Sequence, residues 1–331
     1  MNSLRTTTLR SLALAGMALA VLSAPATAQA PEYPSRTIVL VVPYAPSGGT
    51  DLLARYLGEK LSERLQKRVI IEHRPGTGTV VGAVAVASAP PDGHTLLMAT
   101  STTLAINVGL YHKLPYNPVK DFVPVALVVN VPFVLVVNPA LGVRTLPELI
   151  TLAKAHPTRL TYGSGGIGSP HHLYAELLRS MTGMELTHIP YQGSVPALRE
   201  VVAGHTDLMF SDLAPALPLI REGKLVALGV SSATAVPAAP GIPPLASVGV
   251  PGYDAVAWQM IVAPAGTSKD IVVRLNREFR EIMSAGDTQQ YLSSIGMTPI
   301  VGPGPEELAR FLQSEIARWA KVIEQAGATA D

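Results

Sequence analysis

The feature that most constrains the fold is a repeated alternation of short apolar runs with amphipathic segments. Residues 37–42 (TIVLVV) are continuously apolar, which is typical of a strand buried on both faces of a parallel sheet. A glycine-containing turn follows, and leucines then recur at steps of four from Leu53 to Leu65, forming one apolar stripe along a helix. The pattern predicts an α/β fold built on a parallel sheet.

The same alternation continues along the chain. The further expected strands are 69–72, 95–100, 160–163, 186–191, 207–210, 225–230 and 255–262, and the further expected helices are 79–87, 146–155, 170–181, 196–203 and 214–222. Residues 268–325 are mostly helical in this interpretation. Residues 122–143 carry no formal charge, but their prolines and asparagines predict two short paired strands, 125–129 and 133–137, and argue against a membrane span.

Two series of strands and helices indicate two lobes. We place the chain crossings near Val131 and Tyr253, so that lobe 1 comprises 31–130 plus 254–331 and lobe 2 comprises 131–253. Two crossings suit closure of the lobes over a cleft. In open α/β sheets the ligand lies beyond the carboxyl ends of the strands, so the strand-to-helix turns are the places to look for a site.

The first thirty residues have the features of a secretory signal peptide. Arg5 and Arg10 precede a short apolar run at 11–21, and Ala28-Gln29-Ala30 is a small-x-small cleavage site. The run is shorter than the roughly 20 residues that a membrane span needs. We therefore expect cleavage after Ala30 and a soluble protein in the periplasm.

Composition excludes several classes of function. The chain has 331 residues, of which 48% are hydrophobic and 15% charged, and loss of the two leader arginines changes its formal net charge from +1 to −1. A nearly neutral protein lacks the basic face of a nucleic-acid binder. Because cysteine is absent, there is no disulfide, thiolate metal site or cysteine nucleophile.

The turn Tyr44 to Asp51 is the first candidate site. Gly48 and Gly49 allow close approach of a ligand to the backbone, and the helix that follows offers N–H groups to an anion. Ser47 and Thr50 add hydroxyl donors. The alternative is that the glycines shape the turn and Asp51 caps the helix.

The second candidate turn runs from Gly163 to His172. It formally satisfies G-x-G-x-x-G, yet nothing else indicates a dinucleotide, and an anion-binding helix start explains the same glycines. His171 and His172 are adjacent and project to different sides of a helix, which argues against a metal site. His172 is interpreted as a helix-face hydrogen-bonding residue, with a ligand contact as the alternative.

The third candidate turn lies at 189–196. Tyr191 and Gln192 can present an aromatic wall and an amide to a cleft, and Asp212 ends the next strand, where a ligand or water would lie. Trp258 is interpreted as a core residue. No serine lies in a G-x-S-x-G elbow and no spacing indicates a catalytic triad, so the sequence shows no catalytic machinery.

Six motifs occur in an order that resembles the Bug family of solute-binding proteins. They are PYAPSGGTDLLAR from Pro43, DGHTLLMAT from Asp92, LPYNPVKDFVPVALV from Leu114, YGSGGIGSPHHLYAELL from Tyr162, IPYQGSVPALREVVAGHTDLMFSD from Ile189 and APAGT from Ala263. Bug proteins are the extracytoplasmic receptors of tripartite tricarboxylate transporters. The resemblance covers the chain from the end of the leader to the last helix.

The resemblance implies a two-lobed fold of the type II periplasmic-binding-protein kind, with the ligand cleft between the lobes. It further implies that two strand-to-helix loops hold a ligand carboxylate, often through ordered water. The candidate binding residues are Tyr44, Ser47, Gly48, Gly49, Thr50, Asp51, Thr100, Ser101, Thr102, Ser164, Gly166, Ile167, Gly168, Ser169, His172, Tyr191, Gln192, Gly193 and Asp212.

Two positions depart from the family pattern, which often has glycine at Ser47 and asparagine at Ile167. The expected function is a monomeric receptor that delivers a small carboxylate to the membrane subunits of a tripartite tricarboxylate-type transporter. No catalytic residue, metal, cofactor or nucleic acid is expected. A sensory ligand-binding module and an exported α/β enzyme remain as alternatives.

Overall fold

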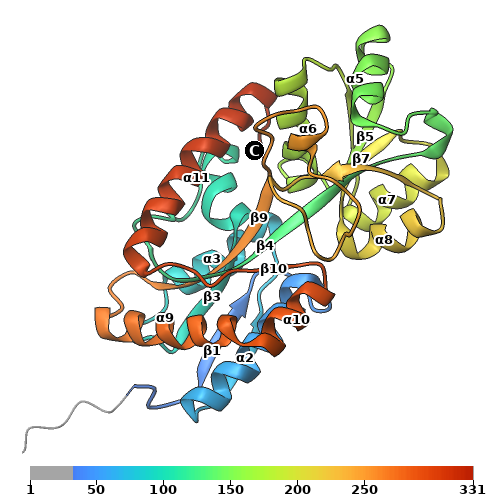
Figure 1. Ribbon diagram of the computed structural model, residues 1–331. Coiled ribbons are helices and arrows are strands. Elements are labelled where there is room, and N and C mark those ends of the chain that lie inside the picture. The colour runs from blue at the N-terminus through green and yellow to red at the C-terminus, as the bar shows by residue number, and fades with distance from the viewer. Residues whose placement is uncertain (1–32, 331) are drawn as a thin grey trace, which may run out of the picture. The chain divides into compact units, whose positions relative to one another are not determined.

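The structure is a computed structural model that describes residues 33–330 (Figure 1). The expected signal peptide and the expected cleavage position after Ala30 lie outside the described residues. From Arg36 onward the chain forms one compact unit.

The first half of the chain alternates strands and helices as expected. Its elements are β1 (Ile38–Val42), α2 (Gly49–Leu65), β2 (Val69–His73), η1 (Thr77–Thr79), α3 (Val80–Ala87), β3 (Thr95–Thr100), the π-helix η2 (Thr102–Ile106), α4 (Asn107–Leu110), β4 (Phe122–Val137), η3 (Pro139–Leu141) and α5 (Leu146–Ala155).

The second half continues the alternation and ends in helices. Its elements are β5 (Thr161–Ser164), α6 (Pro170–Thr182), β6 (Thr187–Pro190), α7 (Ser194–Ala203), β7 (Leu208–Asp212), α8 (Leu213–Arg221), β8 (Val226–Val230), η4 (Leu245–Ser247), β9 (Val256–Pro264), α9 (Lys269–Ser284), α10 (Gly286–Ser294), β10 (Thr298–Pro299) and α11 (Pro305–Ala326).

The strands follow the order β2-β1-β3-β9-β4-β7-β5-β6, with β8 and β10 also paired to β4. The pairs β1–β2, β1–β3, β5–β6 and β5–β7 are parallel, as the sequence predicts. The pairs that β4 and β9 make are antiparallel, so the sheet is mixed. The antiparallel strands lie at the centre of the order, between the two parallel groups.

The prediction of two short strands within 122–143 is wrong, because β4 is a single strand of 16 residues. Its prolines lie where the hydrogen-bond ladder is interrupted. A register shift follows Pro124, and Pro132 is the last β4 residue paired with β9, after which Phe133 pairs with Asp212 of β7. Proline is tolerated at such irregular points because no ladder N–H is needed there.

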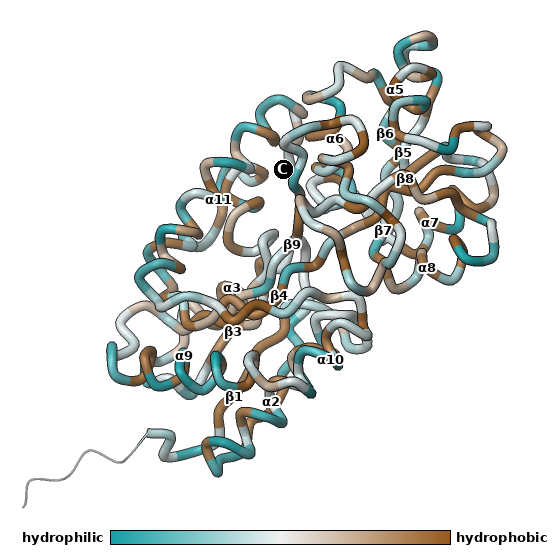
Figure 2. Tube along the Cα trace, in the orientation of Figure 1, coloured by the Kyte–Doolittle hydropathy of each residue, from teal (hydrophilic) through white to brown (hydrophobic). Residues whose placement is uncertain are grey.

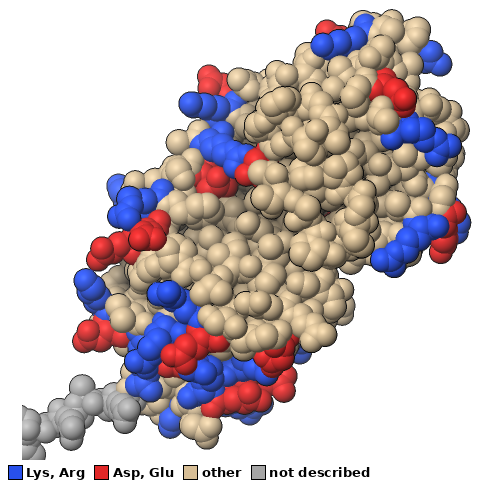
Figure 3. Space-filling view, in the orientation of Figure 1, with Lys and Arg blue, Asp and Glu red and all other residues tan. Residues whose placement is uncertain are grey.

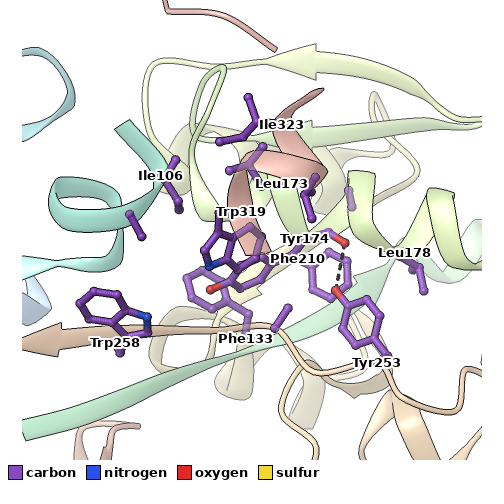
Figure 4. Packing of buried hydrophobic residues seen from close by; sticks show 14 of the residues in the cluster. Ile106, Phe133, Leu173, Tyr174, Leu178, Phe210, Tyr253, Trp258, Trp319 and Ile323 are labelled. Atoms are coloured by element: carbon purple, nitrogen blue, oxygen red, sulfur yellow. Dashed lines mark hydrogen bonds between the residues drawn. The ribbon is translucent and has the colours of Figure 1, made fainter. Parts of the chain in front are cut away.

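Hydrophobic residues, brown in Figure 2, are concentrated in the central strands, whereas hydrophobic and hydrophilic residues alternate along the outer helices such as α11. Trp319 of α11 stacks on Tyr174 of α6 with ring centroids 5.5 Å apart. The Tyr253 hydroxyl donates to the Tyr174 carbonyl at 2.9 Å, close to the ring of Phe210 (Figure 4). This aromatic cluster packs the last helix, α11, against α6.

Among residues 33–330, no helix is both long and apolar enough to cross a membrane. Acidic and basic side chains are interspersed over the end that carries α2 and α9, and the middle of the face shown in Figure 3 is largely uncharged. Arg64 of α2 binds Glu278 of α9 at 2.8 Å in this charged region. Lys60 of α2 likewise lies 2.7 Å from Asp287 of α10, so several of these charges form ion pairs.

Candidate functional site

A cavity of about 820 Å³ lies beyond the carboxyl ends of β1, β3 and β5. Three helices begin at its wall, because Thr50 lies in the first turn of α2, Pro170 is the first residue of α6 and Ser194 is the first residue of α7. The positive ends of these helix dipoles favour an anion in the cavity. The strand-to-helix turns thus lie where the sequence predicts a ligand site.

Ten of the predicted binding residues line this cavity. They are Tyr44, Thr50, Thr100, Ser101, Thr102, Ile167, Gly168, Ser169, Gly193 and Asp212. The other nine do not line it. They are Ser47, Gly48, Gly49, Asp51, Ser164, Gly166, His172, Tyr191 and Gln192.

Tyr44 joins the first turn to the end of β3. Its hydroxyl lies 3.2 Å from the Thr100 hydroxyl, and removal from water raises the pKa of Tyr44 above its ordinary value despite hydrogen bonds with Thr100 and Thr102. Tyr44 therefore stays neutral, and it offers the cavity a hydroxyl group and an aromatic wall.

Asp51 is buried behind the first turn and holds it in shape. Its carboxylate accepts from the Ser47 N–H at 2.8 Å and lies 2.7 Å from His73 Nε2 and 2.9 Å from Arg55 Nε. Burial raises the pKa of Asp51, but these hydrogen bonds and the Arg55 charge outweigh it, so the pKa is lowered. Ser47 has a φ of 77°, a region that favours glycine.

The second turn reaches the cavity with Ile167 and Gly168. Ile167 is 56% exposed, and Ser169 caps α6 by accepting from the His172 N–H. Gly168 has a φ of 74°, and a Cβ atom placed on it would lie 2.3 Å from Leu110 Cδ1. The absence of a side chain at Gly168 therefore lets this turn pack against α4.

His172 supports the second turn from behind. Its Nδ1 accepts from the Gly168 N–H at 3.1 Å, which agrees with the interpretation of His172 as a helix-face hydrogen-bonding residue. Its ring stacks on that of His188, whose Nε2 lies 2.6 Å from the Ser164 hydroxyl. Gly166 completes the turn by donating its N–H to the Ser164 hydroxyl.

His171 and Asp212 form a pair on the cavity wall. His171 Nε2 lies 3.2 Å from the Asp212 carboxylate, and Phe133 packs edge-on against the imidazole. Desolvation raises the pKa of Asp212, but the hydrogen bond and charge of His171 and a hydrogen bond with Ser194 outweigh it, so the pKa is lowered. Asp212 is therefore an anion already held by its neighbours.

In the third turn only Gly193 of the three predicted residues reaches the cavity. The Tyr191 hydroxyl lies 2.7 Å from the Thr206 hydroxyl, and the Gln192 side chain is exposed. Gly193 and Ser194, at the start of α7, are the residues of this turn that line the cavity.

Several lining residues were not among the predictions. They are Gly76, Gly78, Thr79, Asn107, Leu110, Tyr111, Val131, Phe133, Gly165, Pro170, His171, Ser194, Ala257, Trp258, Gln259, Thr329 and Ala330. Residues 76–79 follow β2 in a strand-to-helix turn. The position of ligand sites beyond the carboxyl ends of strands therefore also pointed to this turn. Trp258 is almost fully buried, as predicted, and it also lines the cavity.

The cavity combines neutral polar groups with apolar walls. Within residues 33–330, its lining includes no lysine or arginine, and its one carboxylate is that of Asp212. The described part of the chain also holds no group of three or more histidine, aspartate or glutamate side chains able to bind a metal. An anion in the cavity would be held by backbone N–H groups, hydroxyl groups and helix dipoles.

The sequence matches the family model described as the tripartite tricarboxylate transporter family receptor over residues 53–328. The chain is 38% identical over 316 residues to a UPF0065 protein of the tcbD-tcbE intergenic region in Pseudomonas sp. strain P51, an alignment that covers 95% of this chain and 94% of that protein. It is 36% identical over 320 residues to BugT of Bordetella pertussis, with coverage of 96% and 98%.

Solved structures agree with this assignment. An R. palustris protein solved with adipate has a TM-score of 0.80 and 36% identity, over 90% of this chain and 99% of that one. The periplasmic binding protein BugD has a TM-score of 0.75 and 29% identity, with coverage of 90% and 99%. MatC from Rhodopseudomonas palustris with bound malate has a TM-score of 0.73 and 33% identity, with coverage of 88% and 100%.

These matches confirm the expected α/β periplasmic-binding-protein fold, and they set aside the exported-enzyme alternative because the family consists of transport receptors. The chain belongs to the TctC or Bug family, the periplasmic solute receptors of tripartite tricarboxylate transporters.

Proposed function

We propose that this receptor binds a small carboxylated solute in the cavity beyond β1, β3 and β5 and delivers it to the membrane subunits of a tripartite tricarboxylate-type transporter. The observation that carries the proposal is the convergence of three helix N-termini on a cavity lined by neutral donors. A carboxylate is compact enough to be held by such dipoles without a basic side chain. Adipate and malate in two related structures support the same class of ligand.

The remainder of the cavity favours a solute with an apolar portion. Ile167, Phe133 and Trp258 contribute aliphatic and aromatic surface beside the polar groups of the lining. Burial of apolar ligand surface contributes about 25 cal/mol per Å². We therefore expect an aromatic or aliphatic carboxylate to bind more tightly than a compact polyacid such as citrate.

Calorimetry with matched acids and amides tests this function. Hexanoate, adipate and benzoate are compared with hexanamide, adipamide and benzamide at one pH and ionic strength. The acid should bind and the amide should lose at least about tenfold in affinity, because the helix dipoles stabilise a negative charge. Equal affinity for an acid and its amide would contradict the proposal.

Closure of two lobes over the ligand is part of the proposal. The lobes comprise 31–130 plus 254–331 and 131–253, and both chain crossings lie in or next to the strands β4 and β9 that pair across the middle of the sheet. The radius of gyration measured by solution scattering should fall when ligand is added. An unchanged radius at saturating ligand would argue for a rigid receptor.

We further propose export with cleavage after Ala30 and action as a monomer. Intact-mass measurement of the protein purified from the periplasm tests the cleavage position, and light scattering with and without ligand tests the oligomeric state. A mature chain that begins elsewhere, or a stable dimer, would correct these points without affecting the ligand class.

A further inference from the structure

The wall of the cavity at α4 contains a buried asparagine whose orientation is fixed by its neighbours. Asn107 is fully buried and follows the π-helix η2. Its backbone N–H donates to the Thr102 carbonyl, five residues back, which is the hydrogen bond of a widened turn. The carbonyl of Thr103 accepts instead from the Tyr116 hydroxyl at 2.6 Å.

The Asn107 side-chain amide is held by two acceptors. Its Nδ2 donates to the Gly78 carbonyl at 2.6 Å and to the Tyr116 hydroxyl at 3.0 Å. The Gly78 carbonyl cannot donate a hydrogen bond, so a flipped amide would place two oxygens against each other. Both hydrogens of the amide therefore face the protein, and Oδ1 is the atom left for another partner.

That oxygen has no hydrogen-bond partner in the structure, although it is buried and Asn107 lines the cavity. A buried acceptor without a donor is costly and rare in folded proteins. Ser101, which is 1% exposed and lies on the same wall, has a hydroxyl group that also lacks a partner. The cavity wall thus contains two polar groups, Asn107 Oδ1 and the Ser101 hydroxyl, that make no hydrogen bond within the protein.

We propose that Asn107 Oδ1 is a specificity-determining acceptor, which selects carboxylates that also carry a neutral hydrogen-bond donor, an O–H or an amide N–H. This inference rests on the proposed function, because it names a second group on the same solute. A second carboxylate would be repelled by the carbonyl oxygen. An ammonium group would need a free anion, and Asp212, the one carboxylate of the cavity lining within residues 33–330, is held by His171.

The first test uses the unaltered protein and series of ligands that differ at one group. The series are 4-hydroxybenzoate, 4-methoxybenzoate and benzoate, their 3-substituted counterparts, and 6-hydroxyhexanoate, adipic acid monoamide and hexanoate. A methoxy group accepts but does not donate, so it separates hydrogen bonding from size. In at least one series, the ligand that carries the hydrogen-bond donor should bind about tenfold more tightly than the other ligands of that series. This ratio corresponds to about 1.4 kcal/mol.

The second test uses Asn107→Leu, which keeps a similar volume and removes the acceptor. The preference for the donor should fall to about twofold or less, whereas the exposed neighbour variant Val108→Ala should keep it. Tyr116 lies outside the cavity lining, and Tyr116→Phe removes one of the two groups that hold the Asn107 amide. The preference of this variant for the donor ligand should therefore lie between that of the wild type and that of Asn107→Leu.

The outcomes separate this inference from the proposed function. Carboxylates that bind without preference for a donor would overturn the role of Asn107 and leave the receptor function intact. A preference that survives in both Asn107→Leu and Tyr116→Phe would also overturn it. Absence of binding by every carboxylate would overturn both. If the ligands with a hydroxyl group show the preference and adipic acid monoamide does not, the donor that Asn107 selects is a hydroxyl group.

Discussion

The imidazole rings of His172 and His188 are stacked with centroids 4.1 Å apart and an interplanar angle of 9°. Each ring also bonds the turn that reaches the cavity, His172 to the Gly168 N–H and His188 to the Ser164 hydroxyl. Mutual repulsion disfavours two imidazolium ions in this arrangement. The stack therefore links the shape of the turn to the protonation of two histidines.

Acidification is expected to destabilise the folded protein through this stack. Desolvation lowers the pKa of both rings, and for His188 the nearby His172 and Arg179 add to it and bring the pKa to about 4 from 6.5. Between these values the unfolded chain binds more protons than the folded one, so the free energy of unfolding falls as the pH drops from about 6.5 to about 4. Because His188 is partly exposed, we expect a loss of about 1 to 2 kcal/mol from this group.

Urea denaturation at several pH values checks this expectation. Between pH 6.5 and pH 4, the free energy of unfolding of His188→Gln should change less steeply with pH than that of the wild type. His205→Gln is the matched control, because His205 is an exposed histidine paired with Glu200 and far from the turn in sequence. An equal slope in the wild type and in His188→Gln would show that the stack does not titrate in this range.

Gly168→Ala should destabilise the protein by about 2 kcal/mol and weaken ligand binding. The residue has a φ of 74° and the new Cβ would meet Leu110, so both backbone strain and a steric clash contribute. Gly142→Ala measures the backbone strain without the clash, because Gly142 has a φ of 78° and open space around it. This variant should lose about 1 kcal/mol of stability. Equal losses in the two variants, measured by urea denaturation, would mean that Leu110 yields without cost.

Asp51→Asn should lower the free energy of unfolding by about 2 kcal/mol at pH 7. The variant loses the charge that binds His73 and Arg55, but Arg55 is 55% exposed and can be solvated again. The lowered pKa of Asp51 means that its contribution is present at neutral pH and is lost at acidic pH, so the difference from wild type should shrink toward pH 3. Asp287→Asn, a change in an exposed pair with Lys60, should lower the free energy of unfolding much less than Asp51→Asn does.

Local sequence patterns predicted the α/β fold because each strand and helix has its own signal. The leucine spacing of α2 and the apolar run of β1 are set by short-range geometry. The length of β4 was not predictable in this way. Proline usually ends a strand, but Pro124 lies at a register shift and Pro132 lies where β4 exchanges its partner β9 for β7 and β8. These are tertiary relationships that no local pattern contains.

The site shows the same division. Turns after strands were found because parallel strands end at a common edge, and Thr50 and Gly168 do line the cavity. Asn107 and Thr329 come from a short helix and from the end of the described chain, which reach the cavity through tertiary packing. The sequence pattern predicted that Asp51 contacts the ligand. In the structure Asp51 is buried and binds Ser47, His73 and Arg55, so that it shapes the turn instead.

Ile167 is the position at which a change of ligand preference can be measured most directly. The residue is 56% exposed on the cavity wall, so an asparagine there should fold without a large loss of stability. Its amide would add a donor, and a hydrogen bond to a charged group contributes about 1.5 to 3 kcal/mol. Ile167→Asn should therefore shift relative affinity toward citrate and away from benzoate or hexanoate by about tenfold. Val195→Asn, at an exposed valine outside the cavity lining, should leave the ratio unchanged, and calorimetry that finds the same ratio in both variants would show that Ile167 does not contact the solute.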